Sequence, residues 1–386
     1  FLGGMGVITT ALLLTLGVVA AACGGDHASP TATPAAPLPP LTVLLDSIRL
    51  ASDLPALGAA IVTSGGVAQL EVVGVRRYGG RSYATRDDRW HLGSTLKHQV
   101  AVLVARLVAD GTLSWSTTLP QFFPELAATM RPEYRAVTLR DLLSHTSALP
   151  RDYVSGLGDA RAARAAVVRW AAQQPPVATP GTYAYSNINY MVAGAIVERA
   201  LDQDFERVIA ERLWAPLGMA RAGFGQAGTA GADDEPLGHT VQANGARATY
   251  DAATPGADNP VEYGPAGRAH MPLADWARFI SALLAAEQGR DTPVLSSQGW
   301  RALTAQPYVT TGSDGYGYGM VIATRTWSLG RALFHDGTNT RHYALVGVAP
   351  GRDFAILIVS NQWSASMGAT MDRIFGRLVD FHLRGR

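Results

Sequence analysis

Ser94 and Lys97 stand three residues apart at the start of an apolar run, a spacing that lets two side chains meet on one face of a helix. A serine hydroxyl is a weak nucleophile until a base takes its proton, and a lysine amine with a lowered pKa can be that base. Lys97 is the only lysine among the 32 lysine and arginine residues of the chain. Arginine keeps its proton in proteins, so it cannot replace lysine as a base. The pattern therefore favours a helix that begins at a catalytic Ser-Lys pair.

The residues that follow support this helix. Apolar side chains recur with helical spacing until Asp110-Gly111, which ends the run. The apolar positions are Val100, Leu103, Val104, Leu107 and Val108. The N-terminal end of a helix favours negative charge of the kind that develops near a reacting serine oxygen. The pair alone leaves a simpler interpretation open, in which Ser94 caps the helix and Lys97 is a solvated first-turn residue.

Composition and motif content exclude several classes of function. With 47% hydrophobic residues in 386, the chain can bury a sizeable core. The net charge of +1, without clustered basic residues, gives no reason to expect a nucleic-acid partner. Cys23 is the only cysteine, which excludes disulfides within the chain. The histidines are scattered without a His-Glu-x-x-His motif, and Gly-x-Ser-x-Gly is missing, so we expect no metal site, no cofactor and no α/β-hydrolase.

Residues 1–22 are expected to be an export signal. Residues 7–22 form an apolar run that is short for a membrane span, and small residues precede Cys23. This arrangement resembles a bacterial lipoprotein signal, in which Cys23 would be lipidated and would anchor the protein to a membrane. Ordinary cleavage after Ala22 is the alternative. Either route predicts an exported protein, periplasmic or at the cell surface, with residues 23–40 as a disordered linker.

Strand-type runs occur near both ends of the remaining chain, with helical segments between them. Strands are expected at 58–64, 67–75, 315–324, 325–334, 343–348 and 354–359. Helices are expected at 41–51, 94–109, 160–173, 191–201, 274–286 and 367–383. We therefore predict an α+β fold over 41–386. Residues 41–112 and 272–386 would form an antiparallel sheet flanked by helices, and residues 113–271 an inserted all-helical part.

Two later motifs can supply the other groups that a serine hydrolase needs. Tyr185-x-Asn187 precedes a helix and offers a second proton carrier and an amide. His335-x-Gly337 enters a predicted strand, where a glycine would let a substrate lie close against the backbone. Each motif also has a plain structural interpretation, the first as a polar loop in which Asn187 caps the next helix, the second as a strand-end turn.

The motifs Ser94-x-x-Lys97, Tyr185-x-Asn187 and His335-x-Gly337 occur in this order and at wide separations. Together they resemble the serine β-lactamase and D-alanyl-D-alanine-peptidase (penicillin-binding) superfamily. The pattern is most similar to its class C β-lactamase-like branch, which includes esterases. The segments 90–93, 137–150 and 315–320 also resemble this branch, so the similarity spans about residues 41–386.

The resemblance implies roles for the motif residues. Ser94 would attack a carbonyl and become acylated, while Lys97 and Tyr185 would share the general-base work. The implied substrate-binding positions are Asn187, His335, Gly337 and Thr338. Asn187 would bind both the acyl side chain of the substrate and Lys97. The backbone N–H groups of Ser94 and Thr338 would form the oxyanion hole.

Several residues depart from the pattern of a true β-lactamase. His335 stands where lysine is typical, and Asp336 where a hydroxyl helps bind a carboxylate; the latter should weaken anionic substrates unless its side chain points away. Arg341 could compensate for that charge. Ala148 occupies a position where glycine is usual, and His145 is interpreted as a structural histidine.

Two functions follow from the resemblance. The first is an exported serine hydrolase that forms an acyl-enzyme from ester, amide or β-lactam carbonyls of small-molecule or peptidoglycan-derived substrates. The second is a penicillin-recognising or D-Ala-D-Ala-binding module, or a D-alanyl-D-alanine carboxypeptidase, with little β-lactam turnover. Neither requires a metal or a cofactor.

Overall fold

The computed structural model describes residues 38–311 and 314–385. The predicted export signal, Cys23 and nearly all of the predicted linker lie outside these residues. Within the described ranges, no helix combines the length and the apolar character needed to cross a membrane.

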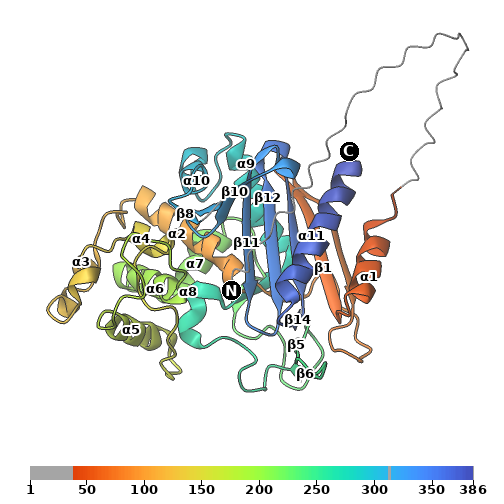
Figure 1. Ribbon diagram of the computed structural model, residues 1–386, viewed down its shortest axis with the longest axis horizontal. Coiled ribbons are helices and arrows are strands. Elements are labelled where there is room, and N and C mark those ends of the chain that lie inside the picture. The colour runs from red at the N-terminus through yellow and green to blue at the C-terminus, as the bar shows by residue number, and fades with distance from the viewer. Residues whose placement is uncertain (1–37, 312–313, 386) are drawn as a thin grey trace, which may run out of the picture. The chain divides into compact units, whose positions relative to one another are not determined.

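An eight-stranded antiparallel sheet forms the centre of the fold (Figure 1). Its strand order is β2-β1-β13-β12-β11-β10-β9-β8. The strands are β1 (Ala56–Thr63), β2 (Gly66–Gly74), β8 (Val309–Thr311), β9 (Asp314–Tyr316), β10 (Val321–Arg325), β11 (Gly330–Thr338), β12 (Tyr343–Ala349) and β13 (Phe354–Ser360). Every residue of β12 and β13 is buried, as expected for central strands covered on both faces. The predicted α+β fold is confirmed.

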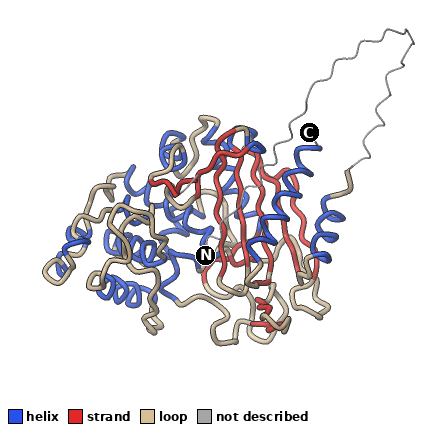
Figure 2. Tube along the Cα trace, in the orientation of Figure 1, coloured by secondary structure: helices blue, strands red, loops and turns tan. Residues whose placement is uncertain are grey.

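Helices cover the two faces of this sheet (Figure 2). Because side chains alternate along a strand, Val346 and Leu357 join one core while Leu345 and Ile356 join the other. Helices α1 and α11 cover the second core, and α2 and α9 contribute to the first. The helices are α1 (Leu41–Ala51), α2 (Leu96–Ala109), α3 (Leu119–Phe122), α4 (Leu139–Leu143), α5 (Ala160–Ala171), α6 (Asn187–Leu201), α7 (Phe205–Ile209), α8 (Gly264–Gly267), α9 (Leu273–Glu287), α10 (Ser297–Thr304) and α11 (Met367–Arg384).

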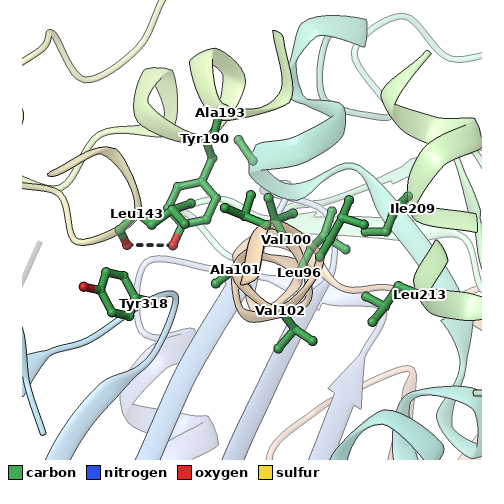
Figure 3. Close-up of a cluster of buried hydrophobic side chains, with 14 of the residues drawn as sticks. Leu96, Val100, Ala101, Val102, Leu143, Tyr190, Ala193, Ile209, Leu213 and Tyr318 are labelled. Atoms are coloured by element: carbon green, nitrogen blue, oxygen red, sulfur yellow. Dashed lines mark hydrogen bonds between the residues drawn. The ribbon is translucent and has the colours of Figure 1, made fainter. Parts of the chain in front are cut away.

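Helix α2 lies inside the first core rather than on the surface. Figure 3 shows Leu96, Val100, Ala101 and Val102 pointing from α2 in different directions into surrounding apolar side chains. Eleven of its fourteen residues are buried, and Lys97, His98 and Gln99 are the polar ones among them. The packing fixes α2, and with it the Ser-Lys turn at its start.

The prediction of an all-helical segment at 113–271 needs correction. This segment also contains β4 (Gly223–Phe224), β5 (Gly238–Val241), β6 (Arg247–Tyr250) and β7 (Ala269–Pro272). They pair with β3 (Arg89–His91) and β14 (Gln362–Trp363) in two small three-stranded sheets. Strands of two to four residues are too short to show a period of two in the sequence.

Two predicted boundaries also move. Helix α6 begins at Asn187, four residues before the predicted Met191. Its N-cap is Ser186, whose Oγ accepts a hydrogen bond from Asn189 N at 3.3 Å, so Asn187 is the first helical residue and not the cap. The predicted strand at 315–324 is interrupted by a turn and forms β9 and β10.

Replacing Arg164 with alanine is expected to lower the free energy of unfolding by about 3–5 kcal/mol. The Arg164 side chain is fully buried and bonds Glu198 and Glu206, so the substitution leaves a buried carboxylate without its partner. Urea unfolding followed by circular dichroism measures the change. Arg199→Ala, which breaks an exposed pair with Glu125, is the matched control and should cost less than about 1 kcal/mol. Equal losses in the two variants would contradict the prediction.

Candidate active site

Ser94 lies in η1 (Gly93–Thr95), a single turn of 3-10 helix that leads into α2. The preceding Gly93 has φ +51°, and a Cβ there would lie 2.2 Å from Thr338 N on β11. Glycine is required by both the left-handed backbone and this contact. The turn that carries Ser94 therefore packs directly against the end of β11.

Lys97 points back from the first turn of α2 to Ser94. Its Nζ lies 2.9 Å from Ser94 Oγ and 2.8 Å from Asn187 Oδ1, and it also donates to the backbone oxygen of Ala266. The side chain is fully buried. Burial disfavours the charged form and lowers the pKa of Lys97 to about 7. A substantial fraction of this amine is therefore neutral at pH 7.

The three neighbours of Lys97 Nζ fix what its neutral form can do. A neutral amine has two N–H groups and one lone pair. The oxygens of Asn187 and Ala266 can only accept hydrogen bonds, so they take the two N–H groups. The lone pair is then left for the hydroxyl proton of Ser94 at 2.9 Å. This is the geometry of a general base and its nucleophile.

Tyr185 approaches Ser94 from another side. Its Oη donates a hydrogen bond to Ser94 Oγ at 2.8 Å. Burial raises the pKa of Tyr185 well above its usual value of about 10, although the bond to Ser94 opposes that shift. Tyr185 therefore stays protonated at neutral pH. Of the two residues expected to share the general-base work, Lys97 has the protonation state that suits it.

The rate of acylation is expected to fall about tenfold per pH unit below pH 7 and to level off above it. The pKa of Lys97 is lowered to about 7, so its neutral fraction is lost as pH falls through that value. The measurement is kcat/KM for an uncharged ester between pH 5 and 9, since this ratio reports groups of the free enzyme. A kcat/KM that keeps rising from pH 7 to pH 9, without a plateau, would instead indicate a tyrosinate base.

Asn187 has both ends of its amide engaged. While Oδ1 accepts from Lys97, Nδ2 donates to Asp152 Oδ1 at 2.7 Å, and Tyr263 Oη donates to the same oxygen at 3.0 Å. The side chain of Asp152 is 41% exposed and also pairs with Arg151. Sequence reasoning expected Asn187 to bind substrate and missed Asp152, which occupies one of the amide's N–H groups.

His335 is buried on β11 near Tyr185, with their ring centroids 6.4 Å apart. Burial lowers the pKa of His335 to about 4, so the ring is neutral at pH 7. Its Nδ1 lies 2.5 Å from the backbone oxygen of Asp336, an acceptor, so Nδ1 carries the proton; Nε2 accepts from Tyr316 Oη at 3.1 Å. His335 thus lies at the site, without the positive charge of the lysine it replaces.

Asp336 points to the opposite face of the sheet. It pairs in register with Leu345, which belongs to the core under α1 and α11, and its Oδ2 accepts a hydrogen bond from Tyr343 Oη at 2.5 Å. The Asp336 side chain therefore points away from the site, which is the condition under which it was not expected to weaken the binding of anionic substrates. Arg341, which could have compensated for the charge of Asp336, stacks elsewhere: its guanidinium lies 4.0 Å from the ring centroid of Tyr250.

The strand that carries His335 continues into the backbone around Ser94. A Cβ at Gly337 would lie 2.2 Å from Leu92 O and 2.6 Å from Ser94 N. The close approach at Gly337, which was expected for a substrate, is made instead by the chain's own turn. Thr338 follows, with its N against Gly93, so the amides of Ser94 and Thr338 lie on two segments in contact.

His145 packs beside Tyr185, and Ala148 follows it three residues later in the chain. The buried His145 ring lies 4.4 Å from the Tyr185 ring, and its Nδ1 accepts from Ser186 N and Asn189 Nδ2. Burial holds the pKa of His145 well below its usual value, as suits a structural histidine. Ala148 has φ +61°, which explains why glycine is usual at this position.

Comparison with known proteins shows to which family the chain belongs. The sequence model of the beta-lactamase family matches residues 46–381. The chain belongs to this family. Penicillin-binding protein 4 of Amycolatopsis lactamdurans is 26% identical over 333 residues, 82% of this chain and 83% of that protein. The unguisins hydrolase ungD' of Aspergillus campestris is 26% identical and covers 72% of this chain, which spans 53% of that protein. Esterase EstB of Burkholderia gladioli is 32% identical over 36% of this chain and 39% of its own.

Solved structures share the fold of this beta-lactamase family member. The D-alanine carboxypeptidase AmpC from Burkholderia cenocepacia has a TM-score of 0.68 at 18% identity, over 87% of this chain and 97% of that one. The octameric penicillin-binding protein homologue from Pyrococcus abyssi has a TM-score of 0.69 at 21% identity, over 83% of this chain and 72% of that one. With hydrolase and esterase relatives in this family, the protein is a serine hydrolase.

Proposed function

We propose that the protein hydrolyses ester and amide carbonyls through an acyl-enzyme formed on Ser94. The observation that carries this proposal is the pair of contacts at Ser94 Oγ, with Lys97 Nζ at 2.9 Å and Tyr185 Oη at 2.8 Å. One neighbour is a base with a pKa lowered to about 7 and the other a protonated acid. A nucleophile between a base and an acid suits acyl transfer.

In the proposed acylation step, Ser94 Oγ bonds to the substrate carbonyl carbon and its proton passes to the Lys97 amine. The carbonyl oxygen becomes an oxyanion that accepts hydrogen bonds from the N–H groups of Ser94 and Thr338. The intermediate collapses and the leaving group takes the proton of Tyr185, which Lys97 then replaces. In the second half, water attacks the carbonyl carbon of the acyl-enzyme and gives a proton to Lys97. Ser94 Oγ leaves with a proton from Tyr185, which Lys97 then replaces.

The neutral His335 favours substrates whose leaving group carries no carboxylate. A lysine at this place would offer a charge to a carboxylate, whereas His335 has a pKa near 4 and both nitrogens bonded within the protein. Simple esters and amides therefore rank ahead of β-lactams and peptides that end in a free carboxylate. A penicillin-recognising protein or D-alanyl-D-alanine carboxypeptidase is the second candidate, supported by the penicillin-binding and carboxypeptidase relatives.

The place of action is proposed from the N-terminal sequence. The apolar run at 7–22 and the small residues before Cys23 support export to the periplasm or cell surface, with a lipid anchor on Cys23. A membrane-tethered hydrolase would meet small exogenous molecules or peptidoglycan-derived substrates.

Intact-protein mass spectrometry tests the proposed reaction. The protein is exposed separately to p-nitrophenyl butyrate, a penicillin and a D-Ala-D-Ala peptide, and the mass of the acyl adduct is followed with time. We expect a butyryl adduct that forms and clears, with slower adducts from the two carboxylate-bearing substrates. A stable penicillin adduct with no ester turnover would favour the second candidate. No adduct from any substrate would overturn the proposal.

Replacing Tyr185 with phenylalanine is expected to lower kcat about 100-fold, within the range for a positioned proton donor. The variant keeps the ring in its place against His145 and removes only the hydroxyl that bonds Ser94. The acylation rate, measured as kcat/KM, should fall less for p-nitrophenyl butyrate than for an alkyl butyrate, because p-nitrophenolate leaves without a proton. Equal losses on the two esters would contradict the role of Tyr185 as proton donor to the leaving group.

A further inference from the structure

Three consecutive loop residues, Ala257, Asp258 and Asn259, bond to three segments that carry the site. Asn259 Nδ2 donates to Gly267 O at 2.8 Å, one residue beyond the carbonyl that binds Lys97. Ala257 O accepts from Asn339 Nδ2 at 3.3 Å, one residue beyond Thr338. Asp258 reaches the third segment, the one that leads into the nucleophile. None of the three belongs to the motifs that the sequence pointed to.

Asp258 acts on that segment through His91. Asp258 Oδ1 lies 2.9 Å from His91 Nε2, and Gly93 N donates to His91 Nδ1 at 3.1 Å. Since Nδ1 accepts, the proton of the neutral ring is on Nε2 and is donated to the carboxylate. The two side chains are only 5% and 7% exposed, so solvent does not compete for these bonds. A single ring thus links a buried carboxylate to the peptide next to Ser94.

The charge of Asp258 is held in place from its other side. Its Oδ2 forms an ion pair with Arg268 Nε at 3.2 Å, while the Nε–H itself is donated to Asn259 O at 2.9 Å. Burial alone would raise the pKa of Asp258, but its interactions with His91 and Arg268 outweigh burial and lower that pKa. Asp258 is therefore a charged acceptor at neutral pH, and charge-assisted hydrogen bonds are the stronger ones.

We propose that His91 and Asp258 are positioning residues for the reaction on Ser94. Asp258 holds the His91 ring, and the ring holds the Gly93 N–H, which sets the direction of the next amide, that of Ser94. The Ser94 N–H is one of the two proposed oxyanion donors, so its direction matters most in the transition state. This inference rests on the proposed function and adds residues that touch neither substrate nor Ser94 Oγ.

Two substitutions test the two nitrogens of the His91 ring separately. His91→Asn keeps an acceptor near Nδ1 for Gly93, whereas His91→Gln keeps a donor near Nε2 for Asp258 and loses that acceptor. We expect His91→Gln to lower kcat for p-nitrophenyl butyrate at least about 10-fold with KM unchanged, because the oxyanion forms after binding. His91→Asn should stay within about 3-fold of wild type, and Asp258→Ala, which keeps the acceptor but frees the ring to rotate, should fall between His91→Asn and His91→Gln.

His270→Gln is the matched control. His270 is also 5% exposed and pairs with His91 in the register of β3 and β7, but its Nδ1 bonds Gly225 O. Exchange of the Gly93 amide proton, followed by NMR, gives a readout independent of turnover and should speed up only when the acceptor is lost. Unchanged kcat in His91→Gln, or equal losses in His91→Gln, His91→Asn and His270→Gln, would overturn the inference. If wild-type Ser94 is never acylated, the proposed function itself fails.

Discussion

Ser94→Ala is expected to abolish acylation and to lower ester turnover about 10⁴-fold or more, the scale on which loss of a catalytic serine acts. The substitution removes the oxygen atom that bonds both Lys97 and Tyr185. What activity remains would come from the two amides and from substrate binding. The measurements are p-nitrophenyl butyrate turnover and the mass of the protein after exposure to the ester.

The fold should survive this substitution. Ser94 is partly exposed and sits in a turn fixed by Gly93 and Gly337 rather than by its own side chain. The melting temperature should therefore stay close to that of wild type, and Ser116→Ala, which changes an exposed serine, is the control for both activity and stability. Retained turnover, or an adduct of wild-type mass increase in Ser94→Ala, would exclude Ser94 as the nucleophile.

The framework of the fold could be predicted because its long elements carry a clear period. The helix at 41–51 and the strands around 343–348 and 354–359 lie where the apolar patterns predicted them. The order of the motifs also predicted which distant residues would meet, and the structure brings Tyr185 and Asn187 to the Ser-Lys turn.

The orientation of Asp336 was within reach of the sequence. If His335 faces the site, its neighbour on a strand must face the other way. The neutral state of His335 could not be predicted, because the lowered pKa depends first on burial by the surrounding fold. Asp152 and Asp258 were also out of reach. Both lie outside any helix or strand, where no periodic pattern places a side chain.

Lys97→Arg is expected to lower acylation roughly 10⁴-fold although the positive charge of the side chain is retained. A guanidinium has donors and no lone pair, so it cannot take the proton of Ser94 at any pH at which the protein is folded. Lys97 is also fully buried, with two carbonyl oxygens and one hydroxyl around Nζ, and the larger planar group must displace some of them. Adduct formation with p-nitrophenyl butyrate measures the loss.

Lys97→Met shows whether the loss comes from the missing base or from a disturbed fold. Methionine is of similar length and enters the buried site without a charge, at a cost of about 1–3 kcal/mol for each oxygen left without its donor. If Lys97 is the base, both variants lose acylation equally while their unfolding curves differ, and the break at pH 7 seen in wild type disappears from what remains. If Lys97→Arg were acylated at the wild-type rate, or kept that break, the proton would have to go elsewhere and Tyr185 would become the base despite its raised pKa.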